Sequence, residues 1–164
     1  MLISMIEKKK YRCCFTGHRP EKLIRTEEDI RMDLEVEIRK AIADGFNVFV
    51  SGMSRGVDIW AAEIVLKIRD EGIPIRLMCA SPYPGFESGW SSKWQKRYIE
   101  TMRAADYAGF TSPAYSKMSY QIRNEWMVNH SSRVIAVFNG HPSGTKNTID
   151  YANWKGIPVV MIKG

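Results

Sequence analysis

The chain has 164 residues, of which 45% are hydrophobic and 26% are charged, a balance typical of a globular protein with a substantial core. Its apolar runs are all shorter than the ~18–20 residues that a membrane span requires, so we expect no membrane partner. The formal net charge of +6 favours anionic partners such as nucleotides or nucleic acid.

Apolar runs that end at glycine or proline divide the chain into alternating strands and helices. In chain order, the pattern predicts a strand over residues 11–16, a helix over 27–44, a strand over 46–51, a helix over 57–71, a strand over 74–80, a helix over 92–105, a strand over 106–111, a helix over 118–130, a strand over 134–138, a helix over 145–155 and a strand over 157–162. Thr26 suits the N-cap of the first helix, because three acidic residues follow it in the first turn. Pro74 is expected to open its strand, a position where the missing N–H is tolerated.

A helix closed by glycine leads directly into a strand at three places, which are Gly45, Gly72 and Gly156. This junction is typical of right-handed βαβ units, which assemble into parallel sheets. The sequence therefore predicts an α/β fold with a mostly parallel sheet. No linker or shift in composition divides residues 1–164, so we expect a single domain.

Polar or glycine-rich loops follow five of the predicted strands. These loops begin at Thr16, Ser51, Ser81, Thr111 and Asn139. In an open parallel sheet the carboxyl ends of the strands share one edge, and ligands bind there at the point where the strand order reverses. We therefore expect the ligand at this edge.

The loop over residues 139–145 is the best candidate for holding a phosphate. It joins a buried strand to a helix N-terminus, where free backbone N–H groups and the helix dipole attract anions. The predicted phosphate-binding residues are Gly140, Ser143, Gly144 and Thr145. The alternative is that this loop binds no ligand and is only a tight strand–helix turn, in which glycine is needed for the backbone conformation. The chain lacks G-x-x-x-x-G-K-[ST], and it lacks G-x-G-x-x-G after the first strand, which disfavours a P-loop NTPase and a conventional NAD dehydrogenase.

Three further segments supply the remaining candidate ligand-binding residues, which are Gly17, His18, Arg19, Gly52, Arg55, Gly56, Asp58 and Arg123. Arg55 could clamp a phosphate or carboxylate with two N–H groups, whereas helix capping is the simpler role for Asp58. His18 is either an acid–base group or a hydrogen-bonded structural residue. Arg123 is either an anion ligand or a surface charge, and helical periodicity does not decide between them.

No metal site is predicted, because the three histidines lack metal-ligand spacing. The three cysteines lie in predicted strands, which favours reduced core thiols in a cytoplasmic protein. Residues 1–6 form too short an apolar segment for a signal peptide. Aromatic side chains near the loop edge could stack on a nucleobase, and these are Tyr83, Phe86 and Trp90.

Three separated motifs, Phe15–Pro20, Ser51–Glu63 and Ser143–Ile149, resemble the YpsA family, and the resemblance extends over about residues 11–162. That family belongs to the SLOG superfamily, which includes the DNA-processing protein DprA and the LOG cytokinin-activating phosphoribohydrolases. The resemblance implies a Rossmann-like three-layer α/β/α sandwich that binds a nucleotide or nucleotide-derived ligand at the strand edge. The superfamily also suggests a homodimer.

Two branches of the superfamily sharpen the functional choice. In the phosphoribohydrolases, an Arg-Lys pair precedes a P-G-G-x-G-T-x-x-E motif whose Arg and Glu are catalytic. This chain is similar in having Arg123-Asn124, but Thr148 occupies the Glu position. Threonine cannot act as a carboxylate base, so another carboxylate would have to substitute, and the candidates are Asp58, Glu63, Glu125 and Asp150. In DprA, which binds single-stranded DNA, the segment Ser51–Asp58 has a close counterpart.

These observations predict a protein that binds a nucleotide or nucleotide-derived small molecule in a sensor or regulatory role. No cofactor is expected to be required, and a nucleotide or phosphate is the bound group we expect. A nucleoside-monophosphate phosphoribohydrolase is the first alternative, and a single-stranded nucleic-acid module, as in DprA, is the second. Whether any reaction is catalysed is left open, and no catalytic residue is assigned.

Overall fold

The computed structural model describes residues 8–164, which form an α/β fold around one six-stranded sheet. Its strands are β1 (Arg12–Gly17), β2 (Val48–Ser51), β3 (Arg76–Ser81), β4 (Tyr107–Phe110), β5 (Arg133–Phe138) and β6 (Val159–Lys163). Its helices are the short 3-10 helix η1 (Pro20–Lys22), α2 (Glu27–Ala43), α3 (Val57–Asp70), α4 (Ser92–Ala104), α5 (Ser119–Asn129) and α6 (Gly144–Trp154). The expectation about a signal peptide concerns residues 1–6, which lie outside the described residues.

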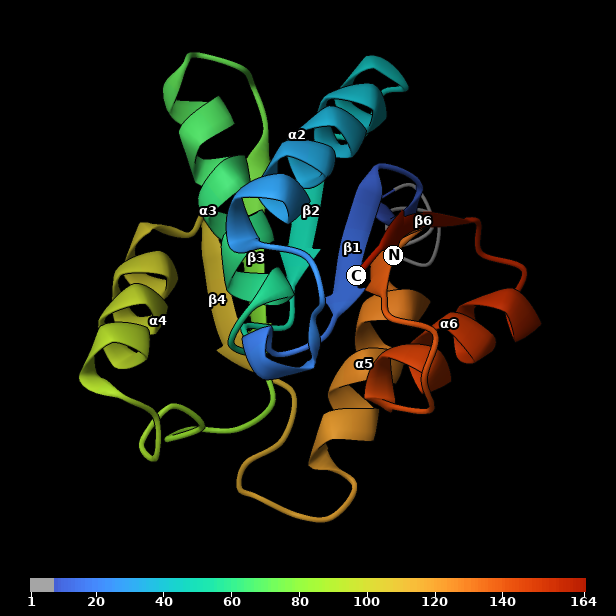
Figure 1. The fold of residues 1–164 in the computed structure, drawn as a ribbon. Helices are drawn as coiled ribbons and strands as arrows, with labels where there is room; N and C mark the ends of the chain where they lie inside the picture. The colour runs from blue at the N-terminus through green and yellow to red at the C-terminus, as the bar shows by residue number, and fades with distance from the viewer. Residues whose placement is uncertain (1–7) are drawn as a thin grey trace.

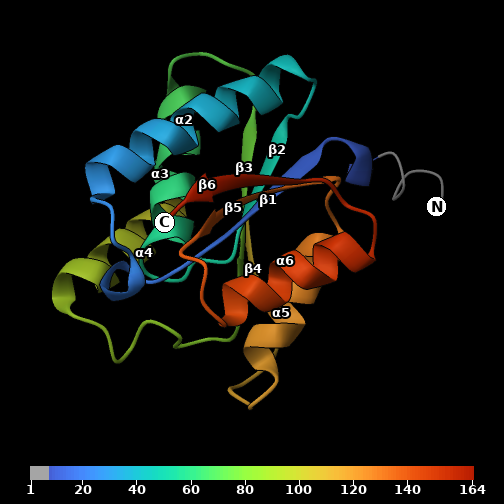
Figure 2. The same cartoon turned by 45° about the vertical axis from the view of Figure 1, so that its right-hand side comes forward.

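The strands lie in the order β4-β3-β2-β1-β5-β6, and every neighbouring pair is parallel. Helices α2, α3 and α4 cover one face of the sheet, while α5 and α6 cover the other (Figures 1 and 2). The chain builds the sheet outward from β1 to β4 and then returns to place β5 beside β1, so the strand order reverses between β1 and β5. The predicted three-layer α/β/α sandwich with a parallel sheet is confirmed.

The core consists of two apolar layers, one on each face of the sheet. Alternation along β1 divides its side chains between them, since Phe15 faces the layer under α2, α3 and α4 and Cys14 faces the layer under α5 and α6. Phe49 and Val50 divide in the same way on β2. Each large side chain buried in this way stabilises the fold by about 1.5–3 kcal/mol.

Several local predictions match the structure. The Thr26 side chain accepts the N–H of Asp29 at 3.1 Å, which confirms it as the N-cap of α2. Glycines follow α2, α3 and α6 with positive φ angles that L-residues rarely adopt. The predicted strand start at Pro74 is wrong, because β3 begins at Arg76 after a turn in which Ile75 donates its N–H to the carbonyl of Ile73. Among residues 8–164, no helix has the length and apolar character that crossing a bilayer requires.

An ion-pair network joins the three helices on the α2–α4 face. Glu63 of α3 accepts from Arg97 of α4 at 2.6 Å and from Arg31 of α2 at 2.8 Å, and Arg97 also pairs with Glu27 at 2.8 Å. The side chains of Arg97 and Glu63 are only 17% and 25% exposed, so water screens this network less than a surface pair. The network therefore fixes how the helices of one layer sit against each other.

We predict that Glu63→Gln lowers the free energy of unfolding by about 1–3 kcal/mol, because it removes the carboxylate that Arg97 and Arg31 share and leaves both guanidinium groups with Glu27 alone. Glu100→Gln is the matched control, since Glu100 pairs at 3.8 Å with Lys96 and both side chains are largely exposed. We expect the control to change stability by less than about 0.5 kcal/mol. Urea denaturation measures both, and equal effects of the two substitutions would contradict the assignment.

Candidate functional site

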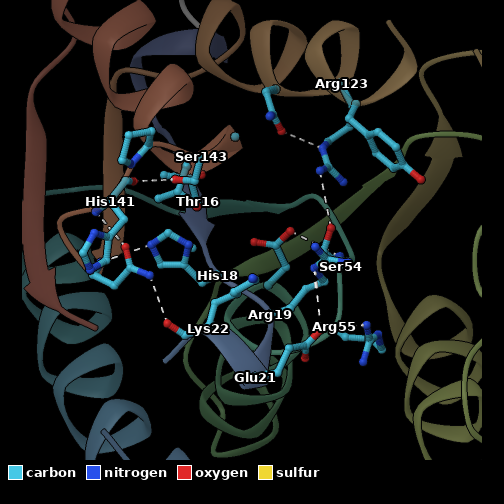
Figure 3. A pocket seen from close by; sticks show the side chains of 18 of the residues that line it. Thr16, His18, Arg19, Glu21, Lys22, Ser54, Arg55, Arg123, His141 and Ser143 are labelled. Atoms are coloured by element: carbon cyan, nitrogen blue, oxygen red, sulfur yellow. Dashed lines mark hydrogen bonds and ion pairs between the residues drawn. The ribbon is translucent and has the colours of Figure 1, made fainter. Parts of the chain in front are cut away.

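A cavity of about 850 Å³ opens at the carboxyl edge of the sheet, beside the point where the strand order reverses. Its walls come from the loops after β1, β2, β3 and β5, from the starts of α3 and α6, and from one face of α5. Figure 3 shows His141 and Ser143 on one side of this pocket and Ser54, Arg55 and Arg123 on the other. The pocket therefore lies at the predicted edge.

The N-terminus of α6 forms one end of the pocket. Ser143 is the N-cap, and its side chain accepts the N–H of Lys146 at 3.1 Å while donating to the carbonyl of His141. Its hydroxyl is therefore already used as a helix cap, which the sequence analysis did not foresee. The N–H groups of Gly144 and Thr145 have no acceptor among the hydrogen bonds of the described residues, and both residues line the pocket. Two free N–H groups at a helix N-terminus suit an anion.

Arg123 lies across the pocket on α5, and it is 6% exposed rather than a surface charge. Its guanidinium donates to the carbonyl of Gly52, to Asn124 Oδ1 at 2.8 Å and to Ser54 Oγ at 3.4 Å. All three acceptors are neutral, and no carboxylate of the described residues forms an ion pair with Arg123. Burial lowers the pKa of Arg123, while the charge of Asp58 acts in the opposite direction. The positive charge therefore remains available to an anion in the pocket.

Asp58 is the buried acidic group of the site. It lines the pocket, is 4% exposed and lies in the first turn of α3. Its Oδ2 accepts the N–H of Ser54 at 3.2 Å, whereas Oδ1 is shielded from solvent and has no partner among the described residues. Burial raises the pKa of Asp58 to about 6, although Arg123 and the hydrogen bonds from Ser54 act against this shift. Asp58 is thus more than the simple helix cap that its position suggests.

His18 joins the two loops on either side of the strand reversal. Its Nε2 accepts the N–H of Asn139 at 3.1 Å, and its ring stacks on Phe138. Burial lowers the pKa of His18, and the nearby charge of His141 lowers it further. A neutral ring that accepts through Nε2 carries its proton on Nδ1. His18 thus makes a structural hydrogen bond between the two loops and also lines the pocket.

Arg19 and Arg55 line the outer wall of the pocket and share Glu21. Arg55 donates to Glu21 at 3.2 Å, and Arg19 lies 3.8 Å from the same carboxylate. The Arg55 guanidinium also lies 5.9 Å from the centre of the Trp90 ring. Glu21 offsets part of the positive charge, so this wall is a weaker anion site than the region around Arg123.

The glycines predicted for the site differ in their roles. Gly17 and Gly144 line the pocket, whereas Gly52, Gly56 and Gly140 do not. A Cβ at Gly52 would lie 2.9 Å from the Arg123 guanidinium, so glycine here lets that side chain dock. Gly56 has a φ of +88°, and a Cβ there would lie 2.6 Å from the carbonyl oxygen of His18. These two glycines therefore shape the walls of the pocket.

An aromatic cluster forms the wall near Arg55. Phe86 and Trp90 pack edge-to-face with ring centres 4.9 Å apart, and Tyr120 lies 5.8 Å from Phe86. All three residues line the pocket. Tyr83 joins the cluster, because its hydroxyl is hydrogen-bonded to the hydroxyl of Tyr120 at 3.1 Å. The pocket thus has a polar end at α6 and an aromatic end at the loop after β3.

The model of the YpsA family, described as the YspA SLOG family, matches residues 13–156. The chain belongs to this family. A UPF0398 protein of Halalkalibacterium halodurans is 26% identical over 118 residues, which cover 71% of this chain and 62% of that protein. The SPbeta prophage-derived protein YoqJ of Bacillus subtilis is 28% identical over 116 residues, which cover 63% of this chain and 68% of YoqJ. The chain therefore spans less than two thirds of the first of these relatives.

Two solved structures of DprA share the fold. The protein from Helicobacter pylori, described for its binding of single-stranded DNA, has a TM-score of 0.66 at 20% identity over 98% of this chain and 68% of that chain. DprA from Streptococcus pneumoniae has a TM-score of 0.62 at 18% identity over 99% of this chain and 53% of that chain. The family and superfamily suggested by the three sequence motifs are confirmed, while the suggested homodimer stays a prediction.

Within this YpsA-family pocket, the structure brings together most of the predicted site residues. Those that line it are Gly17, His18, Arg19, Arg55, Asp58, Arg123, Ser143, Gly144 and Thr145. Others that line it were not among the predicted ligand-binding residues, and these include Glu21, Ser54, Tyr120 and Asn124, whereas Asn139 and His141 lie in the loop predicted to hold a phosphate. Helical spacing from Arg123 could have found Tyr120 and Met127, because residues three and four apart share a helix face.

The carboxylates considered for a phosphoribohydrolase lie in different places. Thr148 is buried and donates its hydroxyl to the carbonyl of Gly144. Glu63 belongs to the ion-pair network between helices, and Asp150 pairs with Lys146 on the surface. Among the four carboxylates named as substitutes, Asp58 alone lines the pocket. Any carboxylate chemistry at the centre of this site would therefore fall to Asp58.

We predict that Asp58 makes stability depend on pH in a defined direction. Its folded-state pKa of about 6 lies above the ordinary value, so Asp58 favours the folded state at acidic pH and this contribution is lost as the pH rises through 6. The stability of the wild type relative to Asp58→Asn should fall between pH 4 and pH 7, on the order of 2 kcal/mol.

Glu21→Gln provides a control of opposite sign. The pKa of Glu21 is lowered, since its hydrogen bonds and the charges of Arg55 and Arg19 outweigh the effect of burial. The stability of the wild type relative to Glu21→Gln should therefore fall as the pH drops. Thermal unfolding between pH 4 and pH 8 measures both differences, and parallel curves for wild type and Asp58→Asn would contradict the environment assigned to Asp58.

Proposed function

We propose that this protein binds a nucleotide or nucleotide-derived small ligand at the carboxyl edge of its sheet and acts as a sensor or regulator. The observation that carries the proposal is one pocket that combines free N–H groups of α6, the guanidinium of Arg123 with its neutral hydrogen-bond acceptors, and an aromatic wall. Phosphate and base are chemically distinct parts of a nucleotide, and the polar and aromatic ends of the pocket would suit them.

The phosphate would lie against the first turn of α6. Gly144 and Thr145 offer N–H groups there, and a Cβ at Gly144 would lie 3.9 Å from Asn124 Nδ2. Asn124 in turn accepts from Arg123, so this side chain connects α6 to the buried guanidinium. Charge-assisted hydrogen bonds of this kind each contribute about 1.5–3 kcal/mol.

The base would lie at the aromatic end. Phe86, Trp90 and Tyr120 present ring faces and edges to the same pocket, and aromatic surfaces of this kind stack on heterocyclic bases. The cavity of about 850 Å³ is within the range that small-molecule ligands occupy. No cofactor is required in this proposal, because the ligand itself is the regulatory signal.

Two substitutions of Gly144 test the phosphate site. Gly144→Ala adds a Cβ that meets only an ordinary contact, so both fold and affinity should be retained. Gly144→Trp should place an indole over the free N–H groups and weaken AMP binding at least about 30-fold, the equivalent of ~2 kcal/mol of lost charge-assisted bonding. Isothermal calorimetry measures affinity and circular dichroism checks the fold. Unchanged AMP affinity in a folded Gly144→Trp variant would remove the phosphate from this site.

A second candidate function is the binding of single-stranded nucleic acid. DprA from Helicobacter pylori binds single-stranded DNA, and this chain shares its fold. The tyrosines beside the pocket favour this candidate, since Tyr115 is 63% exposed and its ring lies 5.6 Å from that of Tyr83. Exposed aromatic side chains next to basic residues are typical stacking platforms for unpaired bases.

Binding of an oligo-dT strand tests this candidate. Affinity should fall about tenfold or more between 50 and 200 mM salt as phosphate contacts are screened. Tyr115→Ala should weaken binding at least about fivefold through lost stacking, whereas Tyr107→Ala on the distant edge strand β4 serves as control. Salt-insensitive binding, or none at all, would dismiss the candidate.

A further inference from the structure

The Asp58 carboxylate contains an oxygen whose hydrogen-bonding capacity the protein does not use. Oδ2 accepts the N–H of Ser54 at 3.2 Å, but Oδ1 has no partner among the described residues, although the residue is 4% exposed. A buried acceptor without a donor costs about 1–3 kcal/mol. An acceptor kept at that cost beside a pocket would gain its missing donor from a ligand that displaces the atoms now covering it.

Neighbouring side chains do not supply that donor. Arg123 directs its N–H groups to Gly52, Ser54 and Asn124. Ser54 lies between the two charged groups, because its N–H binds Asp58 while its hydroxyl accepts from Arg123. The arrangement keeps an acidic acceptor and a basic donor side by side without pairing them. A ligand that satisfies both must carry an anionic group and, close to it, an O–H or N–H donor.

The position of Asp58 indicates which part of the ligand carries this donor. The pocket extends from Gly144 and Thr145 at its polar end to Phe86 and Trp90 at its aromatic end, and Asp58 lines it from the first turn of α3. Its partner Ser54 appears in Figure 3 on the side of Arg55 and Arg123, facing His141 and Ser143 across the pocket. In a nucleoside phosphate, the part between phosphate and base is the sugar, whose hydroxyl groups are hydrogen-bond donors. Carboxylates bind ribose hydroxyls in other nucleotide-binding folds.

We propose that Asp58 is a specificity-determining residue whose Oδ1 accepts a hydrogen bond from a ribose hydroxyl, so that the site selects ribonucleoside phosphates over their deoxy forms. This inference rests on the proposed nucleotide-binding function and names its ligand class. A site built to hydrogen-bond a hydroxyl rejects the analogue that lacks it, because the acceptor is then left buried and unpaired.

The test compares AMP with 2′-deoxy-AMP and 3′-deoxy-AMP by calorimetry on the wild type, Asp58→Asn and Glu100→Gln. The wild type should bind AMP at least about tenfold more tightly than one of the deoxy forms. In Asp58→Asn the amide oxygen can keep the bond from Ser54 while the NH₂ group faces the ligand as a donor, so this preference should shrink to within about twofold. The Asp58→Asn variant should bind inorganic phosphate no more weakly than wild type, since it loses a negative charge near Arg123.

Glu100→Gln is the control, because Glu100 is a largely exposed carboxylate that does not line the pocket. It should keep the full preference for AMP. Equal binding of AMP and both deoxy forms to the wild type would overturn the inference even if Asp58→Asn did not fold, and so would a preference that survives in Asp58→Asn. Failure of the wild type to bind any of the three nucleotides would overturn the proposed function, and the inference with it.

Discussion

The reversal of strand order between β1 and β5 is the constraint on which the site depends. These neighbouring parallel strands send the chain to opposite faces of the sheet, β1 toward α2 and β5 toward α6. The segments that leave the carboxyl ends of these two strands therefore diverge, and a crevice opens between them at the edge of the sheet. The hydrogen bond from the Asn139 N–H to His18 Nε2 joins the two loops at the base of this opening. Loops from distant parts of the sequence meet at this edge because the strand order brings them there.

A buried arginine without an acidic partner gives this crevice its electrostatic character. Removing a guanidinium from water is costly unless hydrogen bonds replace its hydration. Arg123 obtains these bonds from a backbone carbonyl, an amide and a hydroxyl, none of which cancels its charge. Gly52 makes the arrangement sterically feasible, because any side chain there would occupy the space of the guanidinium. The fold thus holds a positive charge that forms no ion pair, although the charge of Asp58 acts on it, opposite the positive end of the α6 dipole. This combination favours an anion between them.

Much of this arrangement follows from local sequence rules, and the rest depends on contacts between distant segments. The alternation of apolar strands with glycine-closed helices was sufficient to predict the parallel sheet and the edge that holds the pocket. Thr26 could be recognised as an N-cap because its signal lies within four residues.

Arg123 could not be distinguished from a surface charge, since its burial depends on Gly52 more than seventy positions away. Ser143 resembled a free donor in the sequence, and only the turn at His141 shows that its hydroxyl is already engaged. The two carboxylate oxygens of Asp58 likewise differ only in the folded protein, where the N–H of Ser54 in the β2–α3 loop donates to Oδ2 and leaves Oδ1 without a partner.

Backbone and arginine NMR during titration with AMP can locate the ligand, because it reports all amide groups at once without assuming where the ligand binds. We expect the N–H resonances of Gly144, Thr145, Gly17 and Ser54 and the Nε–H of Arg123 to shift together with one dissociation constant, while the β4 edge at Tyr107–Phe110 stays unperturbed. Shifts confined to residues away from the carboxyl edge of the sheet, or a set of pocket resonances that does not respond at millimolar AMP, would contradict this expectation.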